Sequence, residues 1–598
     1  MKNPHCQKAF FVLLVLFSST ISSFAQFGGG TGTETDPYQI WNKSHWDELA
    51  DSYNVWLDDS IINTCSDTTG YLGVHFRLMS DIDEVIEKCI PVAYTYDTTT
   101  WEFNEIYFNG FFHGGGHCMN VKINDVFDST GRFLFHYLSE TAYIDSLEVR
   151  GSPINFLGIV DRNYGTIKAL ISNLTEITGL DSNPWLAGIC KANMPGGLII
   201  NCCNYSNISL TTGGGIAGIC LSNQGIVSYC KNIGNIYLKH GTIGGVVRSN
   251  HAIVDHCINY GNISSGEADT PNLVGFGGIC QSAGQISNCI NIGSVNSSIK
   301  RTGGISGYGG NIQNCANYGI ITCTYPDNGG ISGTVSLNGI IIRHSLNIAK
   351  TSNSAITPSI DNSTISNNYY DKQMCLSKGI NGEDVPGSAE GKLTTQLTGT
   401  SPELQAMLGD GWSYAEGRYP IPLGLENDSM ALVAATPIYL YTENENSYNH
   451  VDSVSKNFTV GLENNVNWNA TNERVSFSDE NVTLLSLGIE NLTVSLGDYS
   501  KKVRINILDT EVSTTHQSIE NGISVYPNPA NENITINLNN SKADKLEISD
   551  ITGKIVFSSN AIKVNQILNI SHLKQGIYIL KLIENENIIF TEKFIKQE

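Results

Sequence analysis

Residues 303–321 read Gly-Gly-Ile-Ser-Gly-Tyr-Gly-Gly-Asn-Ile-Gln-Asn-Cys-Ala-Asn-Tyr-Gly-Ile-Ile, and copies of this phrase recur along the middle of the chain. The copies are spaced by roughly 26–32 residues, a period typical of stacked repeats. Glycine pairs supply tight corners and short β-branched runs supply strands, whereas the 3.6-residue spacing of a helix is absent. We therefore predict an all-β fold built on a right-handed parallel β-helix, in which neighbouring coils bury each other's apolar faces.

Two positions of the repeat keep one residue type, and both predict columns of side chains along the stack. The cysteines are Cys202, Cys230, Cys257, Cys289 and Cys315, and the asparagines are Asn204, Asn232, Asn259, Asn291 and Asn317, with a worn copy at Asn347. Equivalent residues of stacked strands lie about 4.8 Å apart, so we expect the asparagine side chains to hydrogen-bond from coil to coil. The same spacing is within reach of disulfide bonds, although a buried ladder of free thiols is the favoured interpretation.

The residue after each of these asparagines alternates between tyrosine and isoleucine. The positions are Tyr205, Ile233, Tyr260, Ile292, Tyr318 and Ile348. We expect a packed stripe along the solenoid. The alternative is an exposed row of tyrosines that stacks on sugar rings.

The bulk composition disfavours some classes of partner. The 598-residue chain has a formal net charge of −22 with only 15% charged residues, and it contains no basic block. Binding to nucleic acid or to an anionic membrane surface is therefore not expected.

The N-terminus reads as an export signal over residues 1–25. Two lysines precede an apolar run, and cleavage is predicted between Ala25 and Gln26. That run is too short to span a bilayer, and no later stretch is long and apolar enough. We expect a secreted or cell-surface protein without a transmembrane segment.

Changes in composition along the chain predict its domain organisation. The segments are the signal peptide (1–25), an N-terminal cap with the first coils (26–150), the β-helix repeats (151–370), a C-terminal cap of the solenoid (371–426), an Ig-like β-sandwich (427–510), a linker (511–518) and a small terminal β-sandwich (519–598).

The repeat resembles the GLUG repeat of bacterial surface proteins, through Gly303-Gly304-Ile305-Ser306-Gly307 and the later Ile312-Gln313-Asn314-Cys315. Residues 427–510 are weakly similar to bacterial Ig-like domains. The C-terminal domain resembles the type A sorting domain of the type IX secretion system of Bacteroidota. That resemblance rests on a set that includes Tyr526, Pro527, Asn528, Pro529, Gly553, Gly576, Tyr578 and Lys593. It implies handling by the type IX secretion machinery, passage across the outer membrane and, often, anchoring at the cell surface.

Motifs for catalysis are scarce. No metalloprotease, serine-hydrolase or P-loop motif is recognisable. His113 and His117 are four residues apart, but the glycines between them supply no general base. Arg248, Asp255 and His256 share one coil and form the candidate catalytic group, although a solvated edge is the favoured interpretation.

Ca²⁺ is the one cofactor for which the sequence offers a group of ligands. Asp81, Asp83 and Glu84 could supply oxygen ligands for Ca²⁺, but a polar turn is the preferred interpretation, so no cofactor is predicted.

The functional hypothesis is an adhesin, in which an extended solenoid face binds a glycan or a host surface protein. The alternative is a carbohydrate-active enzyme, a polysaccharide lyase or hydrolase with a site built from loops. A structural stalk of the surface layer is a third possibility. The sequence leaves the ligand, the anchoring and the oligomeric state open.

Overall fold

The structure is a computed structural model that describes residues 27–597 apart from internal gaps, the longer of which are 123–131, 180–184, 267–274, 335–339, 442–453 and 509–522. The chain divides into two compact units, Met1–Asp509 and Thr510–Glu598, and each is described by itself. The predicted signal peptide with its Ala25–Gln26 bond, and the predicted linker at 511–518, lie outside the described residues.

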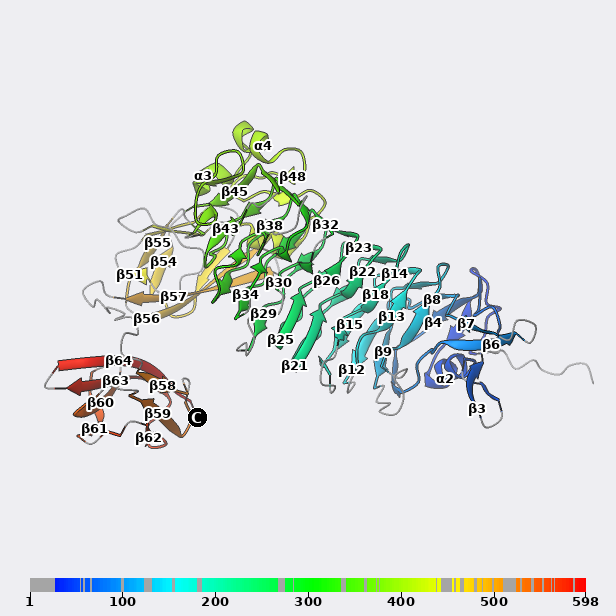
Figure 1. Ribbon diagram of the computed structural model, residues 1–598, viewed down its shortest axis with the longest axis horizontal. Coiled ribbons are helices and arrows are strands. Elements are labelled where there is room, and N and C mark those ends of the chain that lie inside the picture. Colours follow the sequence, from blue (N-terminus) through cyan, green and yellow to red (C-terminus); the bar gives the residue numbers. More distant parts are fainter. Residues whose placement is uncertain are drawn as a thin grey trace, which may run out of the picture. The chain divides into compact units, whose positions relative to one another are not determined.

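The first unit contains a β-helix whose strands stack coil upon coil in four parallel sheets, here named A, D, C and F (Figure 1). Sheet A has 12 strands: β1 (Tyr38–Ile40), β4 (His75–Leu78), β8 (Phe111–His113), β11 (Tyr143–Asp145), β14 (Thr166–Lys168), β19 (Leu198–Ile200), β23 (Ile226–Ser228), β27 (Ile253–Asp255), β32 (Gln285–Ser287), β37 (Asn311–Gln313), β41 (Ile341–Arg343) and β44 (Thr364–Ser366). Sheet D has seven strands: β10 (Phe135–Leu138), β13 (Val160–Asn163), β18 (Cys190–Asn193), β22 (Cys220–Asn223), β26 (Val247–Asn250), β31 (Cys280–Ser282) and β36 (Ser306–Tyr308).

The two remaining sheets each have 12 strands. Sheet C contains β5 (Ile82–Ile86), β9 (Cys118–Val121), β12 (Glu148–Gly151), β15 (Ile171–Leu174), β20 (Cys203–Asn204), β24 (Lys231–Asn232), β28 (Ile258–Asn259), β33 (Ile290–Asn291), β38 (Ala316–Asn317), β42 (Leu346–Asn347), β45 (Asn368–Asp371) and β47 (Ala389–Lys392). Sheet F contains β16 (Glu176–Thr178), β17 (Trp185–Ala187), β21 (Asn207–Ala217), β25 (Ile236–Gly244), β29 (Ile263–Ser265), β30 (Phe276–Gly277), β34 (Val295–Ser297), β35 (Thr302–Gly303), β39 (Ile321–Cys323), β40 (Asn328–Gly329), β43 (Ser354–Thr357) and β46 (Lys378–Ile380).

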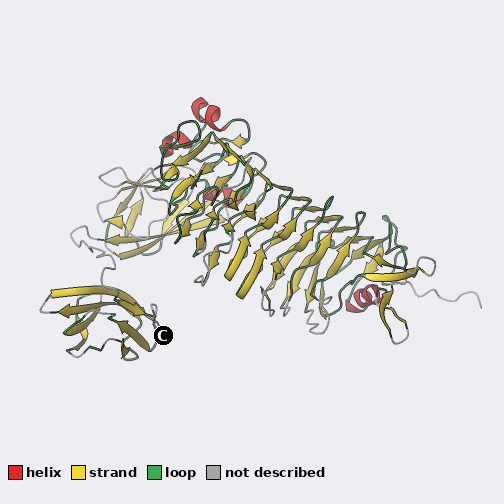
Figure 2. Cartoon of the chain, in the orientation of Figure 1, coloured by secondary structure: helices red, strands yellow, loops and turns green. Residues whose placement is uncertain are grey.

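Equivalent apolar side chains of successive coils stack on one another inside the solenoid. In sheet A the middle residues are register partners and fully buried: Ile199, Val227, Val254, Ile286 and Ile312. Burying one such side chain contributes about 1.5–3 kcal/mol, and the stack repeats it at every coil. The predicted all-β fold with a parallel β-helix is thereby confirmed. The helices in the described part of the chain are few and short (Figure 2).

The asparagines of the repeat form a column of hydrogen bonds. Each Nδ2 up to that of Asn317 donates to the Oδ1 of the next asparagine at 2.8–2.9 Å, and all of these side chains are buried: Asn204, Asn232, Asn259, Asn291, Asn317 and Asn347. A second column, in sheet D, joins Asn163, Asn193, Asn223 and Asn250 in the same way. The columns therefore satisfy polar groups that the coil corners would otherwise bury without partners.

The repeat cysteines are buried thiols rather than disulfides. Their sulfhydryls donate to backbone carbonyls, for example from Cys230 Sγ to Ser228 O at 3.3 Å. Burial raises the pKa of the Cys230 and Cys289 thiols well above the usual range. Both therefore stay protonated and inert.

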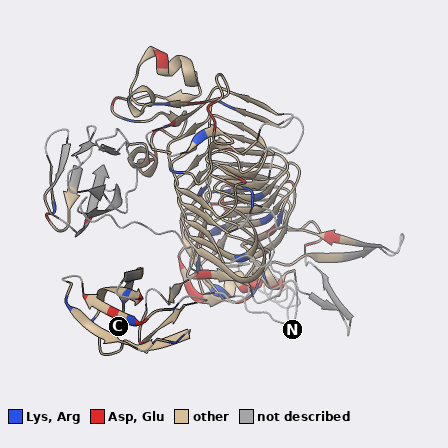
Figure 3. Cartoon of the chain, turned by 60° about the vertical axis from the view of Figure 1, so that its left-hand side comes forward, with Lys and Arg blue, Asp and Glu red and all other residues tan. Residues whose placement is uncertain are grey.

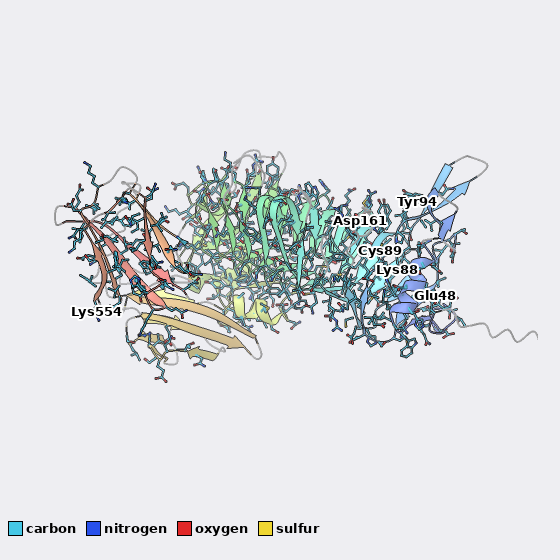
Figure 4. The ribbon with its side chains drawn as sticks, turned by 90° about the horizontal axis from the view of Figure 1, so that it is seen from below. Glu48, Lys88, Cys89, Tyr94, Asp161 and Lys554 are labelled. Atoms are coloured by element: carbon cyan, nitrogen blue, oxygen red, sulfur yellow. The ribbon has the colours of Figure 1, made fainter. Side chains whose placement is uncertain are left out.

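The N-terminal end is covered by α2 (Lys43–Asp51), which begins at the N-cap Asn42. Trp46 on this helix is fully buried and donates from Nε1 to Lys88 O at 2.9 Å. Two antiparallel hairpins are inserted between coils: β2 (Val55–Leu57) with β3 (Ser60–Thr64), and β6 (Ala93–Asp97) with β7 (Glu102–Ile106). Figure 4 labels Tyr94 on the second hairpin.

The coils continue past the predicted boundary at residue 370. β46 pairs in parallel with β43, and β47 pairs in parallel with β45, so the solenoid runs to Lys392. The reason is that coil formation depends on backbone pairing and inward apolar residues, which persist after the glycine phrase has faded.

Residues 393–435, here called the flank segment, fold back along sheet C. Their elements are α3 (Thr394–Leu397), α4 (Pro402–Leu408), β48 (Trp412–Ser413), β49 (Ile421–Pro422) and α5 (Ser429–Ala434). One apolar cluster joins this segment to residues of several coils, including Trp412, Tyr419, Leu425, Ile258, Ile290 and Tyr318. The segment thus covers a side of the solenoid rather than only its last coil. It buries the tyrosine–isoleucine stripe at Tyr318, which is 2% exposed, and leaves Tyr205 49% exposed.

Two β-sandwich-like regions follow. The first region has two four-stranded sheets. One contains β50 (Ile438–Tyr441), β52 (Thr459–Leu462), β55 (Asn481–Leu484) and β54 (Val475–Phe477), and the other contains β51 (Val454–Ser455), β57 (Tyr499–Leu508), β56 (Gly488–Leu496) and β53 (Asn467–Ala470). The second region is the second unit, which has a three-stranded and a four-stranded sheet. The first of these contains β58 (Ser524–Tyr526), β59 (Asn533–Asn537) and β62 (Asn565–Asn569), and the other contains β61 (Ile555–Ser559), β60 (Lys545–Asp550), β63 (Gly576–Glu584) and β64 (Asn587–Lys596).

Candidate functional site

Charged side chains are sparse on the solenoid (Figure 3), and its first coils carry a group of outward aromatic residues. This tyrosine patch consists of Tyr107, Tyr137, Tyr164 and Arg162. The ring centroids of Tyr107 and Tyr137 are 5.1 Å apart, and those of Tyr107 and Tyr164 are 6.0 Å apart with planes inclined by 6°. The Arg162 guanidinium carbon lies 4.7 Å from the centre of the Tyr137 ring. Each tyrosine is half-buried, so part of each ring stays open to solvent.

Coil register assembles the patch. Tyr137 in β10 is the register partner of Arg162 in β13. Phe108 forms a bridge with Leu138, and these two residues follow Tyr107 and Tyr137 in the chain. Phe108 and Leu138 are fully buried, and their packing fixes the backbone from which the two phenol rings project.

The patch combines apolar ring faces with hydrogen-bond donors. Tyr107 Oη donates to Glu105 Oε2 at 2.5 Å. Burial raises the pKa of Tyr107 and of Tyr137, so both phenols remain neutral. Aromatic faces pack against the C–H face of a sugar, while phenol and guanidinium groups bind its hydroxyl or carboxylate oxygens. The arrangement therefore suits a carbohydrate ligand.

A second group, here called the His–Asp relay, lies on the outer face of sheet A and consists of His75, His113 and Asp145. They come from β4, β8 and β11, whose inward residues are fully buried: Phe76, Phe112 and Ile144. His113 Nδ1 lies 3.0 Å from Asp145 Oδ2, and His113 Nε2 lies 3.1 Å from His75 Nδ1. The His113 and Asp145 side chains are 20% and 21% exposed, so the relay is only partly hydrated.

The chemistry of the partners selects one set of tautomers for the neutral relay. Asp145 as a carboxylate only accepts, so His113 donates from Nδ1 and accepts at Nε2 from His75 Nδ1–H. A lone pair is left on His75 Nε2, which has no hydrogen-bond partner within the described residues. Burial, reinforced by His113, lowers the pKa of His75, so the lone pair is present at neutral pH. The relay can therefore act as a base.

Two cations border the relay. Arg77 in β4 is the register partner of His113, and Lys168 in β14 is the register partner of Asp145. Both side chains are exposed. Aromatic rings lie alongside: Phe111 stacks on His75 at 4.3 Å, and Tyr143 lies 6.1 Å from His113.

Of the catalytic candidates predicted from sequence, the structure joins Asp255 to His256. His256 Nδ1 lies 2.6 Å from Asp255 Oδ2, and His256 Nε2 lies 2.9 Å from the Leu423 carbonyl oxygen. A carbonyl only accepts, so both ring nitrogens donate and the ring is an imidazolium. Gly424, at φ +92°, lets the flank segment approach, since a Cβ there would lie 2.8 Å from the His256 ring. We call His256, Asp255 and Leu423 the histidine clasp, because it ties the flank segment to the coils and leaves no nitrogen free for catalysis.

Arg248 is not part of that group. It lies on β26 of sheet D, whereas Asp255 is on β27 of sheet A. Its Nε donates to Thr242 Oγ1 at 2.7 Å, and its guanidinium carbon lies 4.2 Å from the centre of the Trp185 ring. Burial lowers the pKa of Arg248 to about 10. Arg248 and Asp255 therefore lie on different sheets of the solenoid.

The three carboxylates proposed from sequence as Ca²⁺ ligands make hydrogen bonds or ion pairs with different elements of the fold. Asp81 Oδ1 accepts from the Cys118 backbone nitrogen at 3.1 Å, and Glu84 Oε2 accepts from the Lys43 backbone nitrogen at 3.3 Å. Asp83 pairs with an arginine of β12. The hydrogen bond from Cys118 lowers the pKa of Asp81. Within the described residues no group of three or more His, Cys, Asp or Glu side chains could hold a metal ion.

The tyrosine patch and the relay were not found from the sequence. Their members lie in the first coils, where the repeat phrase is unreadable and the register of the strands cannot be inferred. His113 and His117, which are four residues apart in the sequence, have different partners: His113 Nδ1 lies 3.0 Å from Asp145 Oδ2, and His117 Nδ1 lies 3.1 Å from Asp81 Oδ1. The available signal was an apolar residue between polar or amphipathic ones in His75-Phe76-Arg77 and in Tyr143-Ile144-Asp145.

The C-terminal motif residues stabilise the fold of their own domain. Gly553, at φ +84°, donates from its backbone nitrogen to Asp550 O at 3.0 Å and closes the turn between β60 and β61. Tyr578 Oη donates to Lys574 O at 2.8 Å, and its ring stacks on Phe594. Asn528 and Pro529 lie outside the described residues.

Residues 524–597 match the family described as a secretion system C-terminal sorting domain. These residues are a type IX secretion sorting domain. A domain of this kind implies handling by the type IX secretion machinery and a secreted or cell-surface location. No helix within the described ranges has the length and apolar character to cross a membrane.

Similarity to characterised proteins is limited in extent. Ulvan lyase NLR42 of Nonlabens ulvanivorans is 28% identical over 123 residues, which are 20% of this chain and 23% of that protein. The chain thus spans less than a quarter of the length of that relative. Among solved structures, surface layer protein SbsC domains 4–9 share 17% identity over 27% of this chain and 31% of that one, with a TM-score of 0.10. Domains 3 and 4 of rat CD4 share 14% identity over 30% and 95%, with a TM-score of 0.11.

Proposed function

We propose that the solenoid is a glycan-binding module that acts as an adhesin once the chain has been exported by type IX secretion. The tyrosine patch is the observation that carries this proposal. It offers three half-buried rings and a cation on the outside of a rigid stack of coils, and such a platform binds a sugar with little loss of conformational entropy.

The family of the repeats is part of the same proposal. We assign the coils to the GLUG class because Gly303–Gly307 and Cys315 reproduce its phrase and because the phrase spans the strands of one coil, from β35 to β38. The sandwich after the solenoid serves as an Ig-like spacer in this proposal, and the sorting domain delivers the module to the cell exterior.

Binding to a glycan array tests the proposal. The full chain is expected to bind a defined set of glycans, and Tyr137→Ala is expected to weaken binding about tenfold, the value of one aromatic contact. Tyr237→Ala is the matched control, because Tyr237 is 37% exposed and lies on sheet F, apart from the patch.

The array also separates the patch from the tyrosine–isoleucine stripe. Loss of binding in Tyr205→Ala together with full binding in Tyr137→Ala would move the site to the exposed end of the stripe. Absence of binding to every glycan, with a folded protein, would contradict the proposal and favour a protein ligand or a structural stalk.

The catalytic group predicted from sequence does not support the enzyme alternative. The similarity to a lyase covers less than a quarter of that relative, and the catalytic candidates predicted from sequence are engaged in the histidine clasp or lie on another sheet.

A further inference from the structure

The His–Asp relay has a geometry that glycan binding does not require. We propose that His75, backed by His113 and Asp145, is the general base of a β-elimination site that cleaves uronic-acid-containing polysaccharides. This inference adds a reaction to the proposed glycan-binding function and rests on it for capture of the polymer.

The base is defined by the hydrogen-bond chain. His75 Nδ1 is held by His113 Nε2 at 3.1 Å, and His113 Nδ1 is held by Asp145 Oδ2 at 3.0 Å. When His75 Nε2 takes a proton, the positive charge is stabilised through His113 by the Asp145 carboxylate. His75 is the catalytic residue in this scheme, and His113 and Asp145 are positioning residues.

The flanking charges select an acidic sugar. Arg77 and Lys168 are register partners of His113 and Asp145, so their backbones lie about 4.8 Å from the relay on either side. A carboxylate bound by Arg77 would have its negative charge neutralised, which acidifies the adjacent C5–H bond. The other charged group that acts on His75 is Glu34, which opposes binding of a second anion at that edge.

The reaction needs no redox partner. His75 Nε2 takes the C5 proton of the uronate, the C–H electron pair forms a C4–C5 double bond, and the C4–O bond breaks. The leaving oxygen departs with its electron pair and takes a proton from water. Hydrolysis is disfavoured because it requires two cooperating carboxylates, whereas the relay has one, and that carboxylate is engaged with His113.

The relay and the tyrosine patch belong to the same coils. Tyr137 and Tyr143 are six residues apart along one coil, which is at most about 20 Å of extended chain at ~3.3 Å per residue. A short oligosaccharide covers that span, so a polymer bound at the patch reaches the relay.

The experiment incubates the full chain with polymers of galacturonate, of mannuronate and guluronate, and of glucuronate- or iduronate-containing disaccharides. The products are followed by the ultraviolet absorbance of the unsaturated uronate and by mass spectrometry, which distinguishes elimination from hydrolysis by one water. His75→Gln is expected to lower the rate by at least roughly 100-fold, the usual contribution of a general base. His251→Gln is the matched control, because His251 is exposed and lies after β26 of sheet D.

Two further readouts separate catalysis from folding. Added imidazole is expected to restore elimination by His75→Ala. Asp145→Asn is expected to lower the rate and to move the acid limb of the pH–rate profile to lower pH, because protonated His75 loses the carboxylate that stabilises its charge through His113.

Three outcomes would overturn the inference: no unsaturated product from any of these polymers, saturated products only, or equal rates for His75→Gln and the unaltered chain. The glycan array with His75→Gln keeps the two proposals apart. Binding without elimination in the unaltered chain would refute the inference alone, and elimination that survives Tyr137→Ala with no array signal would refute the proposed platform alone.

Discussion

One buried asparagine can hold three hydrogen bonds, and Asn259 does so in the middle of its column. Its Oδ1 accepts from Asn232 at 2.8 Å, and its Nδ2 donates to Asn291 Oδ1 and to Gly261 O at 2.9 Å. Asn259→Ala leaves buried groups unpaired, each at a cost of about 1–3 kcal/mol, so we expect a destabilisation of about 2–4 kcal/mol. Urea unfolding followed by circular dichroism measures it, with the exposed Asn296→Ala as control. Equal midpoints for the two variants would contradict a stabilising column.

The histidine clasp predicts a dependence of stability on pH. The hydrogen bond to Asp255 raises the pKa of His256, so its stabilisation is complete below the unfolded pKa near ~6.5 and is lost as pH rises through the folded pKa. Burial acts to raise the pKa of Asp255, but hydrogen bonds from His256, Ser287 and Asn288 together outweigh burial and lower this pKa. Its contribution is present above its unfolded pKa near ~3.9 and is lost as pH falls through the lowered value. Both contributions are complete between these two unfolded values.

The unfolding midpoints of the unaltered chain and of His256→Gln are therefore expected to differ most between about pH 4 and 6.5 and to converge above His256's folded pKa. A difference that grows with rising pH would show that the clasp does not depend on the imidazolium.

At the level of elements, the flank segment depends on Asp428. This residue accepts from Lys231 Nζ at 2.6 Å and from Tyr260 Oη at 2.5 Å, and its side chain caps α5 through Ala431 N at 2.9 Å. Asp428→Ala removes the cap and both solenoid bonds and is expected to weaken docking by about 1–3 kcal/mol. Asp428→Asn keeps an acceptor and is expected to cost less. Amide hydrogen exchange of residues 419–435 measures the order, and equal exchange in both variants would contradict it.

Strand and coil structure was predictable where one local phrase repeats, because paired glycines and β-branched residues act on the backbone nearby. The asparagine column follows from that period alone, since equal phase in sequence becomes vertical stacking in space. The flank segment and the clasp were not predictable, because Leu423 meets His256 across 167 residues. The relay required the register of three irregular coils, which the sequence between 75 and 145 does not reveal. Local patterns thus predicted the scaffold, and long-range pairing decided the sites.

At the scale of the whole chain, the solenoid and the sorting domain belong to separate compact units. The second unit has its own core, which includes Ile534, Ile548, Leu580 and Phe594. Deleting residues 519–598 is therefore expected to leave the unfolding midpoint of the solenoid unchanged while the chain accumulates in the periplasm, since the sorting domain is what the type IX machinery receives.

A point variant tests whether export depends on the fold of the sorting domain without removing that domain. Tyr578 is 7% exposed and holds Lys574 O and Phe594, so Tyr578→Ala is expected to destabilise the sorting domain by about 3 kcal/mol, as aromatic truncations in cores do, and to reduce export. Ile567→Ser is the control, because Ile567 is 64% exposed. Cell fractionation with antibody against the solenoid measures both. Arrival of the truncated chain at the cell surface would mean that a segment before residue 519 also directs export. Export of the solenoid would then not depend on a folded sorting domain.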